Sequence, residues 1–280
     1  MRRINTEEII TNIKEMCIEA NYKLASDVEN GIRDAYDKES SRIGKRVLGQ
    51  LLDNLEIAQK DLIPICQDTG MTIVFITIGQ EVHIEGGSLE EAINEGIRRG
   101  YQEGYLRKSV VSDPLIRENT KNNTPGIIHY NIVPGDKLKI TIAPKGFGSE
   151  NMSRIYMLKP SDEEEGIKKA VIETVRLAGS NACPPIVVGV GIGGSFEKCA
   201  VLAKYALTRD INIRSDKPHI RRLEEELLTA INNMNIGPAG LGGRTTALGV
   251  NIETYPTHIA GLPVAVNISC HANRHVKREI

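Results

Sequence analysis

The chain of 280 residues contains no tryptophan, and only 4% of its residues are aromatic. Neither sign of charge predominates, because 35 basic and 36 acidic residues leave a formal net charge of −1. A balanced chain offers no basic surface for nucleic acid or for an anionic membrane. The sequence also lacks an apolar run of roughly 20 residues, the length needed to cross a bilayer. We therefore expect a protein with neither nucleic-acid nor membrane partners.

Signals for export and for disulfide bonding are also missing. The N-terminal stretch Met1-Arg2-Arg3-Ile4-Asn5 has no apolar core of the kind that a secretory signal requires. The chain has 5 cysteines, an odd number, which does not suggest a disulfide framework. We therefore expect a cytoplasmic protein whose thiols stay reduced.

The hydrophobic periodicity changes along the chain. Residues 5–61 repeat apolar side chains at helical spacing, which predicts a helical N-terminal region. Residues 71–78 are β-branched and apolar, as in a buried central strand. The segments 127–133 and 138–143 flank Pro134-Gly135-Asp136 and predict a hairpin. We expect an α+β fold, with a mixed, mainly antiparallel sheet covered by helices, in a single domain covering residues 1–280.

The most informative stretch is Pro64-Ile65-Cys66-Gln67-Asp68-Thr69-Gly70. It places a thiol, an amide and a carboxylate on three consecutive residues between a proline and a glycine. A turn lets neighbouring side chains converge on one point, whereas a strand would send them to alternate faces. The stretch therefore predicts a site, although a plain helix-to-strand connection with a half-buried cysteine would also fit.

Two further cysteines lie where one element ends and the next has not begun. Cys183 precedes a double proline, and Cys270 lies among histidine, asparagine and arginine residues. Cys17 and Cys199 instead fall within apolar helical patterns and are interpreted as packing residues. The loop cysteines are widely separated, unlike zinc ligands, which come as close pairs. Soft thiolates in a reducing compartment indicate iron–sulfur or copper(I) chemistry, and three ligands leave one iron of a four-iron cluster open.

Four stretches together carry a family resemblance: residues 64–70, 146–151, 181–185 and 257–275. They resemble the N-terminal, or alpha, part of the class I iron–sulfur fumarate hydratases and of the related tartrate dehydratases. The resemblance extends over essentially the whole chain. It implies a hydro-lyase that reversibly hydrates fumarate to malate, with L-tartrate dehydration or mesaconate hydration as the alternatives.

The resemblance also implies a set of site residues. It predicts a [4Fe-4S] cluster whose open iron acts as a Lewis acid on a dicarboxylate substrate. The implied residues are the cluster ligands Cys66, Cys183 and Cys270, the catalytic residues Asp68 and His258, and the substrate-binding residues Gln67, Arg107, Gly146 and Gly148.

Each of these roles has a simpler structural alternative. Arg107 could belong to a solvated loop, and the glycines at 146 and 148 could form a bulge at the end of a strand. A histidine at position 258 could serve as a hydrogen-bonded structural group. The resemblance favours the functional interpretation in each case.

The resemblance further implies a partner, because this chain lacks the family's remaining Lys, Arg and Thr site residues. We expect a beta subunit that supplies the base and completes the active site, so that the alpha chain is inactive alone. The expected assembly is a dimer of alpha–beta pairs, with a pocket that excludes water from the cluster.

One motif supports a different function. Residues Gly189 to Gly194 match G-x-G-x-x-G between a predicted strand and a predicted helix, with Asp210 about 20 residues further on, as in dinucleotide-binding proteins. However, the helical pattern runs directly into Asp210, where such a fold needs a strand. We interpret the glycines as allowing a helix N-terminus to approach the cluster closely. A non-enzymatic iron–sulfur electron carrier is a further alternative, but it would need four protein ligands.

Overall fold

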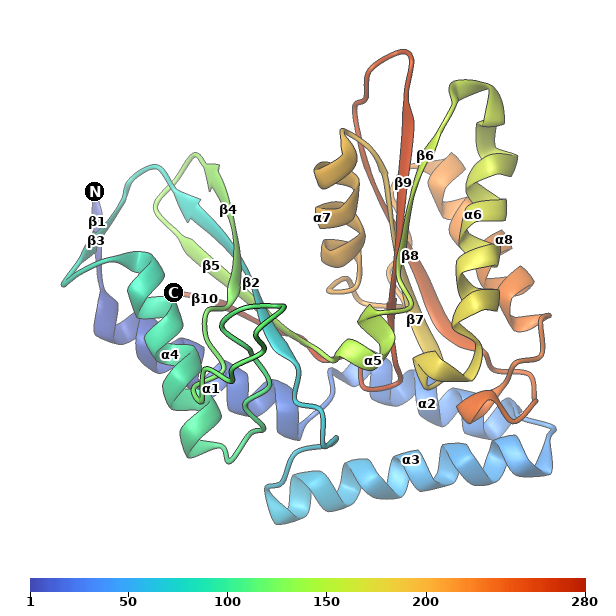
Figure 1. Ribbon diagram of the computed structural model, residues 1–280, viewed down its shortest axis with the longest axis horizontal. Coiled ribbons are helices and arrows are strands. Elements are labelled where there is room, and N and C mark those ends of the chain that lie inside the picture. Colours follow the sequence, from blue (N-terminus) through green and yellow to red (C-terminus); the bar gives the residue numbers. More distant parts are fainter. The chain divides into compact units, whose positions relative to one another are not determined.

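The computed structural model describes all residues from 1 to 280. The chain forms two compact units (Figure 1), each assembled from separate stretches of sequence. None of the helices combines the length and the apolar character that a membrane span requires. The assignment of residues 1–280 to one domain stays a prediction. Unit 1 comprises Met1–Ala25, Leu55–Phe147 and Arg274–Ile280, and unit 2 comprises Ser26–Asn54 and Gly148–Asn273.

Unit 1 packs helices against one four-stranded sheet. Its elements are β1 (Arg2–Asn5), α1 (Thr6–Tyr22), β2 (Met71–Gly79), β3 (Val82–Glu85), α4 (Leu89–Glu103), β4 (Ile127–Val133), β5 (Leu138–Lys145) and β10 (Val276–Glu279). The sheet has the strand order β10-β5-β2-β4, in which only the β2–β4 pair is parallel. Strands β1 and β3 form a separate parallel pair.

Small residues allow α1 and α4 to approach each other closely. A Cβ atom at Gly96 would lie 2.6 Å from Cβ of Ile13, and one at Gly100 would lie 2.8 Å from Cβ of Cys17. Cys17 is therefore part of the helix–helix contact, and burial raises the pKa of its thiol to about 12. The prediction that Cys17 is a packing residue is confirmed.

The predicted hairpin of residues 127–133 and 138–143 is wrong. Strands β4 and β5 do form, but β2 lies between them and pairs with both. The strand with the more continuous apolar sequence takes the central position, since it is buried on both faces. The end of β2 also contacts the chain just after the turn Pro134-Gly135-Asp136, because Gly79 donates its N–H to the carbonyl of Lys137 at 2.8 Å.

Unit 2 is a layered α/β arrangement around a second four-stranded sheet. Helices α6 and α8 pack on one face and α7 on the other (Figure 1). The strand order is β6-β9-β7-β8, and only the β7–β8 pair is parallel. The elements are α2 (Ser26–Lys38), β6 (Arg154–Leu158), α6 (Glu163–Ala178), β7 (Ile186–Gly193), α7 (Phe196–Ala206), α8 (Pro218–Asn232), β8 (Ala247–Tyr255) and β9 (Leu262–Ser269).

Two helices belong to both units along the chain. Helix α3 (Arg42–Asp61) runs from unit 2 into unit 1, and the short helix α5 (Phe147–Glu150) begins at the last residue of the central stretch of unit 1. Single 3₁₀ turns occur at Pro160–Asp162, Gly179–Ala182 and Pro238–Gly240. Helices α1, α2 and α3 confirm the predicted helical N-terminal region. The two mixed, mainly antiparallel sheets with their helices confirm the predicted α+β class.

The glycines of the G-x-G-x-x-G motif serve strand–helix packing. A Cβ atom at Gly189 would lie 2.2 Å from the carbonyl oxygen of Ala203, and one at Gly191 would lie 2.0 Å from that of Cys199. Helix α7 can therefore lie directly on β7 only because these residues have no side chain. Asp210 follows α7 in a loop, and no strand lies there as a dinucleotide-binding unit would require. Cys199 is buried, as predicted for a packing residue.

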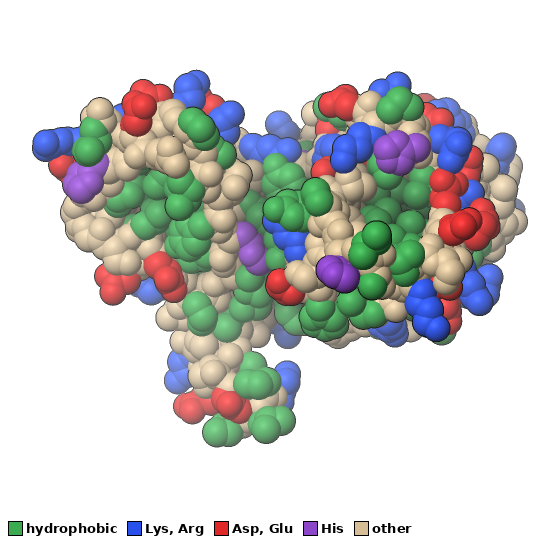
Figure 2. All heavy atoms as spheres, turned by 90° about the horizontal axis from the view of Figure 1, so that it is seen from above, with side chains coloured by type: hydrophobic (Ala, Val, Ile, Leu, Met, Phe, Trp, Pro, Cys, Tyr) green, Lys and Arg blue, Asp and Glu red, His purple; other side chains and the backbone are tan.

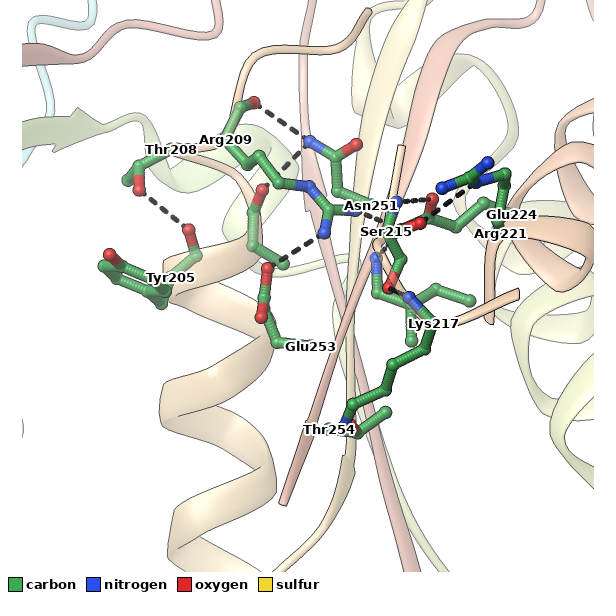
Figure 3. A network of polar contacts seen from close by, with 12 residues as sticks. Tyr205, Thr208, Arg209, Ser215, Lys217, Arg221, Glu224, Asn251, Glu253 and Thr254 are labelled. Atoms are coloured by element: carbon green, nitrogen blue, oxygen red, sulfur yellow. Dashed lines mark hydrogen bonds and ion pairs between the residues drawn. The ribbon is translucent and has the colours of Figure 1, made fainter. Parts of the chain in front are cut away.

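A buried carboxylate connects three segments of unit 2 (Figure 3). The side chain of Glu224 on α8 is 0% exposed and forms an ion pair with Arg209. Its carboxylate also accepts the N–H of Ile252 at 2.8 Å and that of Ser215 at 2.9 Å. Arg209 is paired in turn with Glu253 at 3.1 Å. These contacts tie β8 and the segment after α7 to the middle of α8.

Replacing Glu224 by Ala is expected to lower the free energy of unfolding by about 3–5 kcal/mol, because the change leaves two N–H groups and part of a guanidinium without their acceptor. The measurement is urea unfolding followed by circular dichroism at neutral pH. Glu226 on the same helix is the control, since its side chain is 44% exposed and pairs only with Lys168 and Arg222. Its replacement should cost less than about 1 kcal/mol. Equal losses for both variants would contradict a structural role for Glu224.

Candidate active site

The turn at residues 64–70 is fixed by backbone contacts within unit 1. The N–H of Ile65 donates to the carbonyl of Asn21 at 2.9 Å. Gly70 has a φ of +76°, and a Cβ atom there would lie 2.7 Å from the backbone of Lys145. Only glycine fits this position without strain, because the backbone is left-handed and the neighbouring strand is too close. The turn therefore leads the chain directly onto β2 beside the end of β5.

Two buried polar side chains support the turn from within the unit. The hydroxyl of Tyr101 lies 2.8 Å from the carbonyl oxygen of Thr69 and 3.1 Å from that of Gly70. Asn123 donates its amide to the same Gly70 carbonyl at 3.2 Å. Burial raises the pKa of Tyr101, so the phenol stays a neutral donor. These contacts fix the backbone at Thr69 and Gly70, directly after Gln67 and Asp68.

The carboxylate of Asp68 is held at both oxygens. Oδ1 accepts the N–H of Gly70 at 2.9 Å, and Oδ2 accepts the N–H of Phe147 at 2.9 Å. Each carboxylate oxygen has two lone pairs, so each can still interact with one further donor. The structure thus presents an oriented carboxylate that retains the capacity to bind a hydroxyl group.

Gln67 and Arg107 form a second pair in unit 1. Nη1 of Arg107 donates to Oε1 of Gln67 at 2.9 Å, and the hydroxyl of Thr69 donates to the carbonyl of Arg107 at 2.9 Å. Both Gln67 and Arg107 are exposed. A guanidinium can hold a carboxylate through two parallel hydrogen bonds, and Arg107 uses only one nitrogen for Gln67 in this pair. The predicted anion-binding residue therefore lies beside the turn that carries Asp68.

The glycine-rich segment at residues 146–148 approaches the same carboxylate. A Cβ atom at Gly146 would lie 3.1 Å from Oδ2 of Asp68 and 3.5 Å from Nη2 of Arg274. The N–H of Phe147 binds Asp68 and so is already used within the protein. Gly148 has open space around its Cα. A substrate-binding role for Gly146 and Gly148 stays a prediction.

Unit 2 brings Cys183 and Cys270 to the same end of its sheet. Cys183 lies just before β7, and Cys270 directly follows β9, whose last residue Ser269 pairs with Val187 at the start of β7. The backbone at Cys183 is left-handed, with a φ of +53°. Nδ1 of His271 lies 3.1 Å from the carbonyl oxygen of Cys183. The two cysteine loops are therefore joined by a direct contact.

The thiols fit the donor set of a three-cysteine cluster in their chemistry and accessibility. All five cysteines are free, and Cys66, Cys183 and Cys270 are at least partly exposed, whereas the other two are buried. Cys66 belongs to unit 1 and the other two loop cysteines to unit 2. Neither unit alone groups three metal-binding side chains.

His258 lies at the opposite end of the unit 2 sheet from these cysteines. It follows Tyr255, which pairs with Gly193 at the far end of β7. Eight strand residues separate the two ends by about 26 Å, at about 3.3 Å per residue. The expectation that the glycines of residues 189–194 let a helix N-terminus approach the cluster is also wrong, because Gly193 and Gly194 lie at the end of β7 remote from Cys183. Unit 2 does not bring His258 to the cysteines, and its catalytic role stays a prediction.

The surroundings of His258 are those of a structured turn beside a cavity. Its Nδ1 accepts the N–H of Ala260 at 3.2 Å, and its carbonyl accepts the N–H of Gly261 at 2.9 Å. A cavity of about 450 Å³ lies next to it, lined also by His219 and by apolar side chains of α6, α8 and β7. Figure 2, which looks onto this end, shows histidines around a hollow with apolar walls. The local contacts of His258 therefore match the alternative interpretation, in which this histidine is a hydrogen-bonded structural group.

Several supporting residues escaped the sequence analysis. Arg274 is buried, and its Nη1 donates to Oδ1 of Asn21 at 2.8 Å. Arg274 and His271 fall within the stretch from Cys270 to His275, whose density of polar residues was a visible signal. Tyr101 and Asn123 carried none, because each is an isolated residue far along the chain from the turn it supports.

Comparisons with known proteins agree with the predicted resemblance. A family model described as Fumarate hydratase (Fumerase) matches residues 10–279. A protein of Methanocaldococcus jannaschii, provisionally named L(+)-tartrate dehydratase subunit alpha, is 45% identical over 274 residues, which is 96% of each chain. The L(+)-tartrate dehydratase alpha subunits of Escherichia coli K12 and Shigella sonnei are 32% identical over 271 residues, covering 95% of this chain and 88% of each relative. The chain therefore belongs to the fumarate hydratase (Fumerase) family of hydro-lyases, in which it corresponds to the alpha subunit.

Proposed function

We propose that this chain is the alpha subunit of a hydro-lyase that dehydrates L-(+)-tartrate. The observation that carries the proposal is the turn of unit 1, where the carboxylate of Asp68 is fixed by two N–H groups beside the Arg107–Gln67 pair. An oriented carboxylate and a cation next to it can move a proton and anchor a substrate carboxylate. The names of the relatives at 45% and 32% identity support tartrate as the substrate.

Fumarate is the second candidate substrate, favoured by the description of the matching family. Tartrate loses one hydroxyl group and the hydrogen of the neighbouring carbon, and the resulting enol rearranges to a 2-oxo dicarboxylate. Fumarate hydration to malate is the same type of reaction in the opposite direction, without the second hydroxyl group. One additional hydroxyl therefore distinguishes the two substrates, and a buried polar group that binds it could discriminate strongly. Neither description names mesaconate.

Cys66, Cys183 and Cys270 would hold a [4Fe-4S] cluster in this proposal. Their free, partly exposed thiols are the soft donors that such a cluster needs. When bound, a cluster with three protein ligands supplies an open iron that acts as a Lewis acid toward hydroxyl and carboxylate oxygens. His271 would fix the loop of Cys183 through its contact with that residue's carbonyl group.

The residues of unit 1 would bind the substrate and handle a proton. Arg107 would bind one substrate carboxylate, and Gln67 would orient the guanidinium through the 2.9 Å hydrogen bond between them. Asp68 would first take up a proton and then pass it to the departing hydroxyl group, which leaves as water, because hydroxide is a poor leaving group. The N–H groups of Gly70 and Phe147 would keep its carboxylate in place during the transfer.

A beta subunit would complete the site. The relatives are named as alpha subunits. Arg107 would bind one carboxylate of the substrate, and a dicarboxylate has a second one. The companion chain would supply the further cations and the base that removes the carbon-bound proton. A pocket closed by a second chain would also exclude water from the bound substrate. His258 lies at the end of the unit 2 sheet opposite to Cys183 and Cys270. A catalytic role for His258 would therefore require that it act at a different site of unit 2 from the one formed by these two cysteines.

The test compares substrates under anaerobic conditions. The chain is produced alone and together with its companion beta chain, and initial rates are measured for L-tartrate dehydration and for fumarate hydration. We expect activity only with both chains, and a kcat/KM for tartrate at least about 10-fold above that for fumarate. A preference for fumarate would establish the second candidate instead. Full activity of the chain alone would contradict the need for a partner.

A further inference from the structure

Strand β4 forms a free edge of the unit 1 sheet. It pairs on one side with β2 and is the last strand in the order β10-β5-β2-β4. Its sequence, Ile-Ile-His-Tyr-Asn-Ile-Val, has no lysine, arginine, aspartate or glutamate and no internal proline or glycine. Proteins usually protect an exposed edge with charge, proline or a bulge, because an unprotected edge can pair with another strand. β4 carries none of these protections within its length.

The backbone direction of β4 follows from one hydrogen bond. The carbonyl of Val133 accepts the N–H of Gln80, the residue that follows β2, at 2.8 Å. Val133 therefore directs its backbone groups toward β2, and so does every second residue before it. The N–H and C=O groups of Ile128, Tyr130 and Ile132 consequently point outward, away from the sheet.

The side chains of β4 are also available for contact. Ile132 is 67% exposed and Tyr130 is 48% exposed, although both are on a strand of the sheet. Ile127 is exposed as well, and Ile128 packs partly against the core of unit 1. Large apolar side chains on an unpaired edge are the usual mark of a strand that becomes covered by a partner.

The sequence of β4 is chemically symmetric about Tyr130. Two apolar residues and one polar residue precede Tyr130, and one polar residue and two apolar residues follow it. In an antiparallel pair of two β4 strands around a two-fold axis at Tyr130, Ile128 faces Ile132, His129 faces Asn131, and Ile127 faces Val133. Every apolar residue meets an apolar residue, and the polar residues meet each other, so the strand is complementary to itself.

We propose that β4 is the docking edge for a second copy of this chain, which extends the four-stranded sheet of unit 1 across a two-fold axis at Tyr130. The three outward-facing residues then exchange N–H···O=C bonds with their counterparts in the other copy. A different subunit could pair with β4 whether or not the β4 sequence were symmetric. The symmetry of the sequence is explained by pairing with a second copy of the same chain. The inference does not depend on the proposed reaction, since it uses no residue of the candidate active site.

Cysteine cross-linking tests the position of the axis. Directly opposite residues of a hydrogen-bonded antiparallel pair have Cα atoms about 5.5 Å apart, within the range that a disulfide spans. In the proposed dimer Tyr130→Cys links to itself, whereas the two copies of Ile132→Cys lie about 13 Å apart along the strands. We expect mild oxidation of the full chain, with its companion where the two purify together, to cross-link Tyr130→Cys on the order of 10-fold faster or more.

Mass spectrometry of the cross-linked peptide spanning residues 127–133 separates this bond from disulfides of the native cysteines. Ile132 is the more exposed of the two positions. Faster cross-linking of Ile132→Cys than of Tyr130→Cys would overturn the proposal, because the rates would then follow exposure and not pairing about an axis at Tyr130. Slow cross-linking of both variants would also overturn it.

Sedimentation provides a second measurement with a matched control. Ile132→Lys places a charge opposite Ile128 twice in the symmetric dimer, so we expect dimer dissociation to increase about 10- to 100-fold. Met157→Lys is the control, since Met157 is 60% exposed on β6, an edge strand of the other sheet, and should leave the dimer unchanged. Wild-type chains that remain single, or an Ile132→Lys variant that loses only a companion chain, would show that the edge has another occupant.

Discussion

Alanine at Cys66, Cys183 or Cys270 is expected to abolish both iron binding and activity, because each change removes one of the three proposed cluster ligands. The measurement is the iron and acid-labile sulfide content of anaerobically prepared protein, combined with its visible absorption spectrum. The wild-type protein should carry close to four irons per chain. The loss should be complete for each variant, since an iron–sulfur cluster with two protein ligands is poorly held.

The control is built into the same chain. Cys17 and Cys199 are buried, and burial raises the pKa of both thiols, so neither is available as a thiolate ligand. Cys17→Ala and Cys199→Ala should therefore keep the wild-type iron content. Retention of iron after any of the three loop changes would remove that residue from the ligand set. A wild-type chain that binds no iron would reject the cluster and leave the family assignment intact.

Asp68→Asn is expected to lower kcat about 100- to 10,000-fold with little change in iron content, because the amide cannot deliver a proton to a departing hydroxyl group. The amide is similar in size to the carboxylate and can still accept a hydrogen bond through one oxygen. The comparison of iron content with kcat, measured with the companion chain present, separates a catalytic effect from a loss of the cofactor.

Asp113 provides a matched control for Asp68. One of its carboxylate oxygens accepts the N–H groups of Leu115 and Ile116, both at 2.8 Å, and these bonds hold the pKa of its carboxyl group below the usual range. Asp113 thus resembles Asp68 in holding a loop through two backbone donors. Asp113→Asn should change kcat by less than about 2-fold. Equal losses in the two variants would indicate that Asp68 has only a structural role.

The buried strands were predictable because their burial is continuous. Residues of β2, β7 and β9 are apolar over most of their length, and no other element fits such runs between turn residues. Strands β1, β6 and β10 were missed, since each has 5 residues or fewer and includes charged side chains. Their strand character comes from pairing with distant segments, which a local pattern does not contain.

The hairpin error has the same origin as these omissions. The turn signal at Pro134-Gly135-Asp136 correctly located a chain reversal, but local sequence cannot tell whether a third strand lies between the two arms. The central position of β2 depends on competition between segments for the most buried place in the sheet. That competition is settled by the whole unit and not by the turn.

The candidate site was partly predictable for a related reason. Gln67 and Asp68 were found because they adjoin Cys66 in a turn, and Arg107 was found through the family resemblance. Their supports are single residues from other segments: Tyr101 on α4, Asn123 in a loop and Phe147 at the start of α5. A lone tyrosine or asparagine in a sequence does not reveal which backbone group it will bind.

The interrupted make-up of unit 1 has a consequence for protein synthesis. Unit 2 is complete once Asn273 has been made, whereas unit 1 still lacks β10, which pairs with β5. Domains usually fold in the order in which the ribosome makes them, from the N-terminus onward. Here the unit that contains the first residue is the last to become complete. Until β10 is synthesised, one edge of β5 has no partner strand. The nascent chain therefore exposes the incomplete sheet of unit 1 to chaperones at a stage when unit 2 is already able to fold.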